Sequence, residues 1–257
     1  MRTVTCASGT ERREKELEMT TVRHAFDEEL KQLQHELLEM GSYVEQMLDQ
    51  AVQSLCQRDE ELAKEIVRRD DVVDEMDVNI EMHCLRLLAL QQPMARDLRL
   101  IGTVLKAITD LERIGDHSVD IAKAAIRLKE HPRVIALVDV PLMKEKVCAM
   151  IRNGLDSFTQ HDMELAYEVC DMDNEVDKLY RRMRKSILTS MMREPVDLEA
   201  AALMLLVLYY LERCADHAVN VAERVVFVET GVLRQLAVSH SGIYVPEENY
   251  EEDLNQR

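Results

Sequence analysis

The sequence has no tryptophan, three phenylalanines, seven glycines and five prolines among its 257 residues. Sheet proteins draw on aromatic strand residues and on turns rich in glycine and proline, so this composition argues against them. Leucine, alanine, glutamate, methionine and arginine, which favour helices, are well represented. The composition therefore predicts an all-α fold.

Positive charge is also scarce in this chain. It carries 32 Lys and Arg residues against 49 Asp and Glu residues, a net charge of -17. Because a polyphosphate backbone repels such a chain on average, we expect no nucleic-acid binding. The acidic excess suits cations or basic protein surfaces, although it is also compatible with a role in solubility alone.

The six cysteines never form a C-x-x-C pair, which argues against zinc ribbons and thioredoxin-like redox chemistry. We expect reduced, mostly buried thiols. The longest apolar run, Ala200 to Leu211, is too short to span a bilayer, and the first 24 residues lack the apolar region of a signal peptide. These features predict a soluble, cytoplasmic protein without membrane insertion.

All five prolines lie between segments with helical periodicity, as expected if proline ends helices. In the first segment, apolar residues alternate at intervals of three and four from Phe26 to Leu55, which is typical of a helix in a bundle. The pattern predicts six long helices, at 25–57, 60–91, 96–129, 140–160, 163–193 and 197–229.

An internal repeat organises these helices. The motif D-x-x-V-D begins at Asp70 and again at Asp173, an offset of 103 residues. The motif E-R-x-x-D-H begins at Glu112 and again at Glu212, an offset of 100. We therefore predict two tandem three-helix bundles of antiparallel helices. The expected parts are an N-terminal extension, repeat 1, repeat 2 and an acidic C-terminal tail, at 1–24, 25–130, 140–230 and 231–257.

Carboxylates line one face of the third helix in each repeat. Glu112, Asp116 and Asp120 follow one another at intervals of four residues, which places them on the same side of a helix. Repeat 2 has an amide at the last of these positions; its three residues are Glu212, Asp216 and Asn220. Like charges at this spacing repel one another, so an external cation would explain why they are tolerated.

Both glutamates fall within the apolar stripe that faces the bundle, and neither has a basic residue three or four positions away. Arg113 and Arg213 follow them directly and are expected to project to a different side, so the counter-charge must come from elsewhere. The preceding helices supply further acidic pairs, Asp70 with Asp74 and Asp173 with Asp177. An oxygen-only site of this kind suits Mg²⁺, Ca²⁺, Mn²⁺ or ferric iron.

Two other interpretations remain open. Asp116, Asp177 and Asp216 each have an arginine three or four residues away, so the acidic groups could form surface ion pairs in a structural adaptor without metal. A di-metal carboxylate enzyme would need Glu-x-x-His on two helices, and no histidine has an acidic residue three positions earlier. His117 and His217 sit about 100° round the helix from the aspartates before them, so we expect them to flank the sites.

These motifs, together with LALQQPMARDLR at residues 88–99, resemble the PhoU family of bacterial phosphate-transport accessory proteins over about residues 25–229. The resemblance implies a non-enzymatic cytoplasmic regulator, often a homodimer, that contacts the ATPase subunit of the phosphate ABC transporter and a phosphate sensor histidine kinase. It would repress the phosphate-starvation response when phosphate is plentiful. Bound iron, manganese, magnesium or zinc is implied, and Asn220 departs from the family pattern. The implied ligands are Asp70, Asp74, Glu112, Asp116, Asp120, Asp173, Asp177, Glu212, Asp216 and Asn220.

Overall fold

The computed structural model describes residues 7–193 and 197–233, with side chains from residue 23 onward. Every regular element in this part of the chain is a helix, which confirms the all-α prediction. The helices are α1 (Ala7–Gln57), α2 (Glu60–Arg68), α3 (Asp70–Gln91), α4 (Ala95–Leu128), α5 (Pro132–Ile135), α6 (Val140–Gln160), α7 (Met163–Arg193) and α8 (Leu198–Thr230).

Short polar signals set the helix ends. Four aspartates accept hydrogen bonds from backbone N–H groups in the first turns of α2, α6, α7 and α8, namely Asp59, Asp139, Asp162 and Asp197. Gly231 ends α8 with a φ of 73°, a left-handed conformation that glycine adopts without steric cost. The same conformation at His161 ends α6.

The helices differ from their predicted spans in three places. The first helix begins at Ala7 instead of residue 25, and the predicted 60–91 helix divides at Arg69. The Arg69 N–H bonds to the carbonyls of both Glu65 and Ile66, and its guanidinium bonds to Gln50 of α1 at 2.6 Å. The bond to Gln50 ties the break to another helix, so a contact between helices accompanies it. The third difference is the short helix α5, which lies within the predicted linker.

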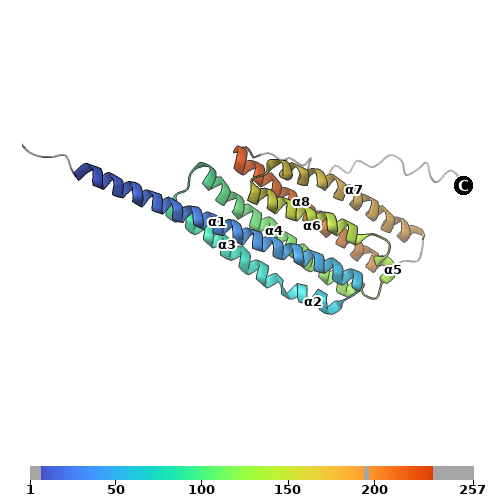
Figure 1. Ribbon diagram of the computed structural model, residues 1–257. Helices are drawn as coiled ribbons and strands as arrows, with labels where there is room; N and C mark the ends of the chain where they lie inside the picture. The colour runs from blue at the N-terminus through green and yellow to red at the C-terminus, as the bar shows by residue number, and fades with distance from the viewer. Residues whose placement is uncertain (1–6, 194–196, 234–257) are drawn as a thin grey trace, which may run out of the picture.

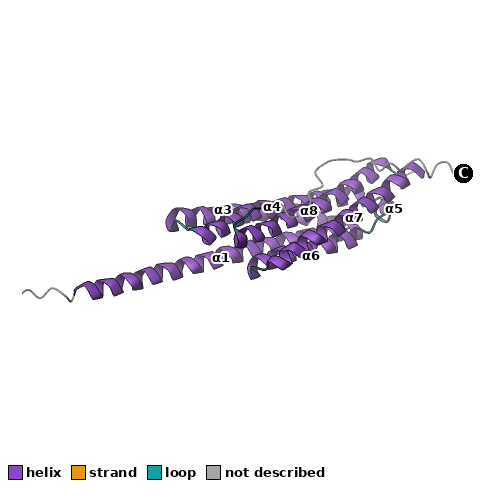
Figure 2. Cartoon of the chain, turned by 90° about the horizontal axis from the view of Figure 1, so that it is seen from above, coloured by secondary structure: helices purple, strands orange, loops and turns teal. Residues whose placement is uncertain are grey.

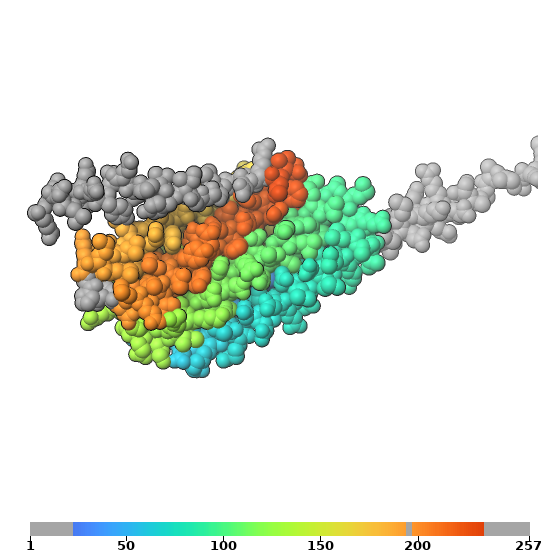
Figure 3. Space-filling model, turned by 180° about the vertical axis from the view of Figure 1, so that it is seen from behind, coloured from blue at the N-terminus to red at the C-terminus, as the bar shows by residue number. Residues whose placement is uncertain are grey.

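The long helices run along one common axis and form an elongated bundle (Figures 1 and 2). α1, α3 and α4 pack together, with α2 against α1 and α4, while α6, α7 and α8 form a second group of three. The two groups join where α4 lies against α8 and α1 against α6. On the face in Figure 3, α3, α4 and α8 lie side by side. One continuous apolar core runs through both groups.

Burial within the bundle also determines the protonation and reactivity of most of the cysteine thiols. Cys84, Cys148, Cys170 and Cys214 are buried and Cys56 is exposed, with all five as free thiols. Burial raises the pKa of Cys84, Cys148 and Cys170 to about 12, so these thiols stay protonated and unreactive at neutral pH. Within the described part of the chain, no helix is both long and apolar enough to cross a membrane.

Candidate metal centres

In repeat 1, carboxylates from α3 and α4 face one another. Burial raises the pKa of Glu112, whose side chain is only 24% exposed, and neighbouring Asp116, Asp77 and Asp74 raise it further. The pKa of Asp70 is raised by burial and then by Asp116 and Asp74. The structure therefore brings together four of the predicted residues. Asp77 joins them, although it lies outside the motif from which they were predicted.

Asp120 occupies the next turn of α4, closer to repeat 2. Its carboxylate lies 3.8 Å from the ammonium of Lys123, three residues further along the helix. It also contributes, after burial, to raising the pKa of Tyr210 on α8. Asp120 therefore has Lys123 as its nearest basic partner and lies within electrostatic reach of Tyr210.

In repeat 2, Arg213 folds back onto the glutamate that precedes it. Its Nε and Nη2 donate hydrogen bonds of 2.7 and 2.8 Å to the two carboxylate oxygens of Glu212, and its Nη1 lies 2.9 Å from Asp216. The expectation that Arg213 projects to a different side is wrong, because the long arginine side chain bends back along the helix surface. Arg113 does the same more weakly in repeat 1, at 3.3 Å from Glu112 and 2.9 Å from Asp116.

Repeat 2 nevertheless contains a carboxylate whose ionised form is disfavoured. The pKa of Asp216 is raised to about 6, by burial first and then by Glu212, with Asp177 adding to the effect. Asp177 on α7 is only 14% exposed and lies 3.9 Å from Arg181. Asp173 lies one turn before Asp177 on α7 and is partly buried. The second cluster thus resembles the first, with a closer pairing between its glutamate and the following arginine.

These clusters match a hard cation in donor chemistry, since they offer only oxygen ligands and carry charge that burial makes unfavourable. As the side chains lie, however, no three His, Cys, Asp or Glu groups in the described residues converge closely enough to hold an ion. Binding would require rotation of the carboxylates, and in repeat 2 the release of Glu212 by Arg213. Cation binding in repeat 1 therefore requires the smaller side-chain rearrangement.

The two motif histidines lie at the contact between the repeats. The His117 ring stacks on Tyr210 of α8 with centroids 5.4 Å apart, and it lies 5.8 Å from the His217 ring. Burial and then His217 lower the pKa of His117, and its buried Nδ1 has no hydrogen-bond partner. His217 Nδ1 lies 2.9 Å from Asp110 of α4. These side chains join α4 to α8.

Asp110 is a structural residue that the sequence did not indicate. It accepts a 2.9 Å hydrogen bond from the side-chain amide of Asn220, on the same oxygen that faces His217. Asn220 is thereby engaged across the repeat contact and not with the carboxylates of its own repeat. The equivalent of Asp110 in repeat 2 is Tyr210, so comparison of the repeats gave no signal for this position.

Known proteins are similar to this chain over most of its length. The family model described as the PhoU domain matches twice, at residues 37–125 and 140–225. The "Phosphate-specific transport system accessory protein PhoU homolog" of Clostridium acetobutylicum is 40% identical over 210 residues, covering 81% of this chain and 96% of the relative.

Two solved structures have a similar fold. The crystal structure of PhoU from Pseudomonas aeruginosa is 37% identical with a TM-score of 0.76, covering 80% of this chain and 100% of its own. The phosphate transport system regulatory protein PhoU from Streptococcus pneumoniae is 32% identical, also with a TM-score of 0.76, and the match covers 81% of this chain and 99% of that one.

Proposed function

The chain belongs to the PhoU family, and from this premise we propose that it is a non-catalytic, metal-bearing regulator of phosphate uptake. In this proposal it acts in the cytoplasm, contacts the ATPase subunit of the phosphate ABC transporter and a sensor histidine kinase, and represses the phosphate-starvation response when phosphate is plentiful. The observation that carries the regulatory role is similarity, over 81% of this chain, to relatives named as accessory and regulatory proteins of phosphate transport.

The metal-binding part of the proposal is supported by the carboxylate clusters. In repeat 1 the cation would be held by Asp70, Asp74, Glu112 and Asp116, and in repeat 2 by Asp173, Asp177, Glu212 and Asp216. The raised pKa values of Asp70, Glu112 and Asp216 support this role, because burial and neighbouring carboxylates disfavour their ionised forms and a bound cation would offset that cost. A hard cation supplies charge neutralisation and links helices; the carboxylates supply its oxygen ligands.

A metal-free helical adaptor is the second candidate function. It is favoured by one observation, the two hydrogen bonds from Arg213 that already neutralise Glu212. In that case the acidic clusters are internal ion pairs, and partner binding depends on the outer helix surfaces alone. Metal content separates the two candidates.

The metal test is elemental analysis of protein purified without chelator. We expect bound metal in the wild type and a large reduction in the double variant Glu112→Ala with Glu212→Ala, with the helical circular dichroism spectrum unchanged. A matched control is Glu61→Ala with Glu164→Ala, two exposed glutamates at equivalent positions of the repeats. Metal-free wild type, or equal metal in both double variants, contradicts the metal assignment.

The regulatory test is independent of metal. Deleting the gene should derepress phosphate-scavenging genes in phosphate-rich medium, and restoring the wild-type gene should repress them again. The purified chain should also retain the transporter ATPase subunit and the kinase in a pull-down. Unaltered expression after deletion contradicts the regulatory role, whatever the metal content.

A further inference from the structure

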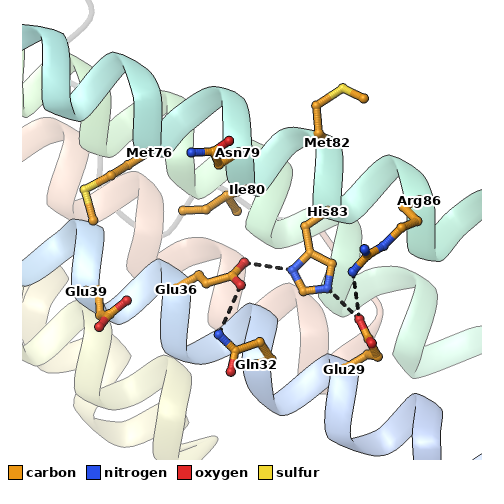
Figure 4. Close-up of a pocket in the computed structure, with 10 residues that line it drawn as sticks. All are labelled: Glu29, Gln32, Glu36, Glu39, Met76, Asn79, Ile80, Met82, His83 and Arg86. Atoms are coloured by element: carbon orange, nitrogen blue, oxygen red, sulfur yellow. Dashed lines mark hydrogen bonds and ion pairs between the residues drawn. The ribbon is translucent and has the colours of Figure 1, made fainter.

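An open groove of about 870 Å³ runs between α1 and α3, and none of its lining residues belongs to the candidate metal clusters. Figure 4 shows His83 reaching from α3 toward two glutamates of α1. Its Nδ1 lies 2.7 Å from Glu36 and its Nε2 lies 3.0 Å from Glu29, which also accepts a 3.0 Å hydrogen bond from Arg86. The His83 side chain is only 8% exposed, so this network forms a fixed floor.

Acidic residues dominate the two helices that form the groove. Residues 70–91 of α3 contain six Asp or Glu residues and one Arg, and three of the six, Asp70, Asp74 and Asp77, belong to the cluster that faces α4. Residues 26–40 of α1 contain five Asp or Glu residues and one Lys. Glu39 lines the groove, and the exposed Glu81 lies in the sequence between Ile80 and Met82, two residues that also line it. The surface therefore attracts basic groups.

The outward face of α3 beside this groove is apolar. Val78, Met82 and Leu85 are 55%, 61% and 45% exposed, and their spacing of four and three places them in one stripe. Met82 points away from the groove floor in Figure 4. A helix in a soluble protein usually turns such a stripe toward another element, so this face lacks a partner within the described chain.

Repeat 2 shows that the fold does not require this stripe. The offset of 103 places Arg181, Lys185 and Leu188 of α7 at the positions of Val78, Met82 and Leu85. A hollow on this part of α7 is lined by basic and hydroxyl side chains, namely Arg182, Lys185, Ser186, Thr189, Ser190 and Arg193. The acidic and apolar character is specific to repeat 1.

We propose that the α1–α3 groove is a docking site for a basic amphipathic helix of a partner protein. The apolar side of that helix covers the stripe, and its Lys or Arg side chains meet the glutamates of α1 and α3. Flexible methionine suits such a surface because it adapts to differently shaped side chains. This inference rests on the proposed function, because a regulator that acts through other proteins needs a surface to bind them.

Binding of a designed peptide tests the groove directly. The probe is a fluorescent helical peptide of about four turns with leucine on one face and lysine on the other. Measured by anisotropy at physiological salt with chelated protein, Met82→Lys should weaken binding by roughly tenfold or more, because it puts a like charge in the groove. Met82→Leu should bind as the wild type does, and the same peptide with glutamate for lysine should not bind.

Met192→Lys is the matched control, since Met192 of α7 is 88% exposed and receives the same chemical change outside the groove. It should lower affinity by no more than the general change in net charge. Equal losses in Met82→Lys and Met192→Lys overturn the proposal, because binding is then non-specific attraction to an acidic chain. A wild-type dimer that Met82→Lys dissociates also overturns it, since a second copy then occupies the stripe. None of these readouts depends on metal content or on gene expression.

Discussion

His217 Nδ1 of α8 lies 2.9 Å from a carboxylate oxygen of Asp110 on α4, and this contact fastens repeat 2 to repeat 1. Asn220 donates to the same oxygen. The side chains of His217 and Asp110 are only 22% and 17% exposed. Water therefore cannot readily replace either residue as the hydrogen-bond partner of the other. The seam between the repeats thus contains polar contacts within a largely apolar interface.

Asp110→Ala should therefore lower the free energy of unfolding by about 1–3 kcal/mol, because the partly buried His217 and the exposed Asn220 both lose their acceptor. Urea denaturation monitored by circular dichroism measures this loss. Asp156→Ala, at an exposed position of α6, is the control and should change stability by less than about 0.5 kcal/mol. Equal effects of the two substitutions would show that the seam contact contributes nothing.

Arg213→Gln should make repeat 2 more dependent on a cation. The substitution removes the hydrogen bonds to Glu212 and the ion pair to Asp216, so the chelated protein should lose about 1 kcal/mol of stability after allowance for solvent screening. Added Mn²⁺ should then raise its melting temperature more than it raises that of the wild type. Arg113→Gln, at the more weakly paired equivalent position, should show a smaller version of both effects. An identical Mn²⁺ response in wild type and Arg213→Gln argues against a cation site at Glu212.

Stability should also depend on the protonation of Asp216. Its pKa in the folded chain is raised from 3.8 to about 6, by burial first, so the folded chain binds this proton more tightly than the unfolded chain does. The contribution of Asp216 to stability is therefore most favourable below about pH 4 and declines as the pH rises to about 6. In chelated protein, Asp216→Asn should melt at a higher temperature than wild type at about pH 7.5, and this gain should shrink toward pH 4. Thermal melts across this range check the sign, and a gain that grows on acidification contradicts it.

Two glycines in long helices should respond oppositely to alanine. A methyl group at Gly102 of α4 meets no atom within 4 Å, so Gly102→Ala should add about 0.5–1 kcal/mol through helix propensity. At Gly41 of α1 the methyl carbon would clash with the Cδ1 atom of Leu155 on α6. Gly41→Ala should therefore cost about 1–2 kcal/mol by displacing that side chain. Denaturant midpoints compare the pair, and stabilisation by both would show that α1 and α6 have room to separate.

Periodicity and the repeat predicted most of the fold, because each long helix buries a stripe of apolar residues whose three- and four-residue spacing is visible in its sequence. The break at Arg69 was not predictable in this way. No proline or glycine marks it, and its causes include a hydrogen bond to Gln50 on another helix. The start of α1 at Ala7 was missed because the first 24 residues show no apolar stripe, the pattern on which the boundary at 25 was based.

Sequence spacing predicted which carboxylates share a helix face and missed contacts that depend on side-chain length. It placed Glu112 and Asp116 on one face of α4, because residues four apart share a helix face, and the structure brings Asp70 of α3 near them. It excluded Arg213 as a partner of Glu212 because it treated neighbouring positions as fixed directions, whereas the guanidinium reaches back along the helix. Asp110 lies opposite His217 only after α4 and α8 pack, so no local pattern indicated it.

The unlike faces of α3 and α7 carry a consequence for stoichiometry. Duplication gave the chain two copies of one architecture, yet Met82 in the first copy corresponds to Lys185 in the second. A basic ligand therefore has a single binding site on each molecule despite the internal repeat. Saturation should occur at one such ligand per chain.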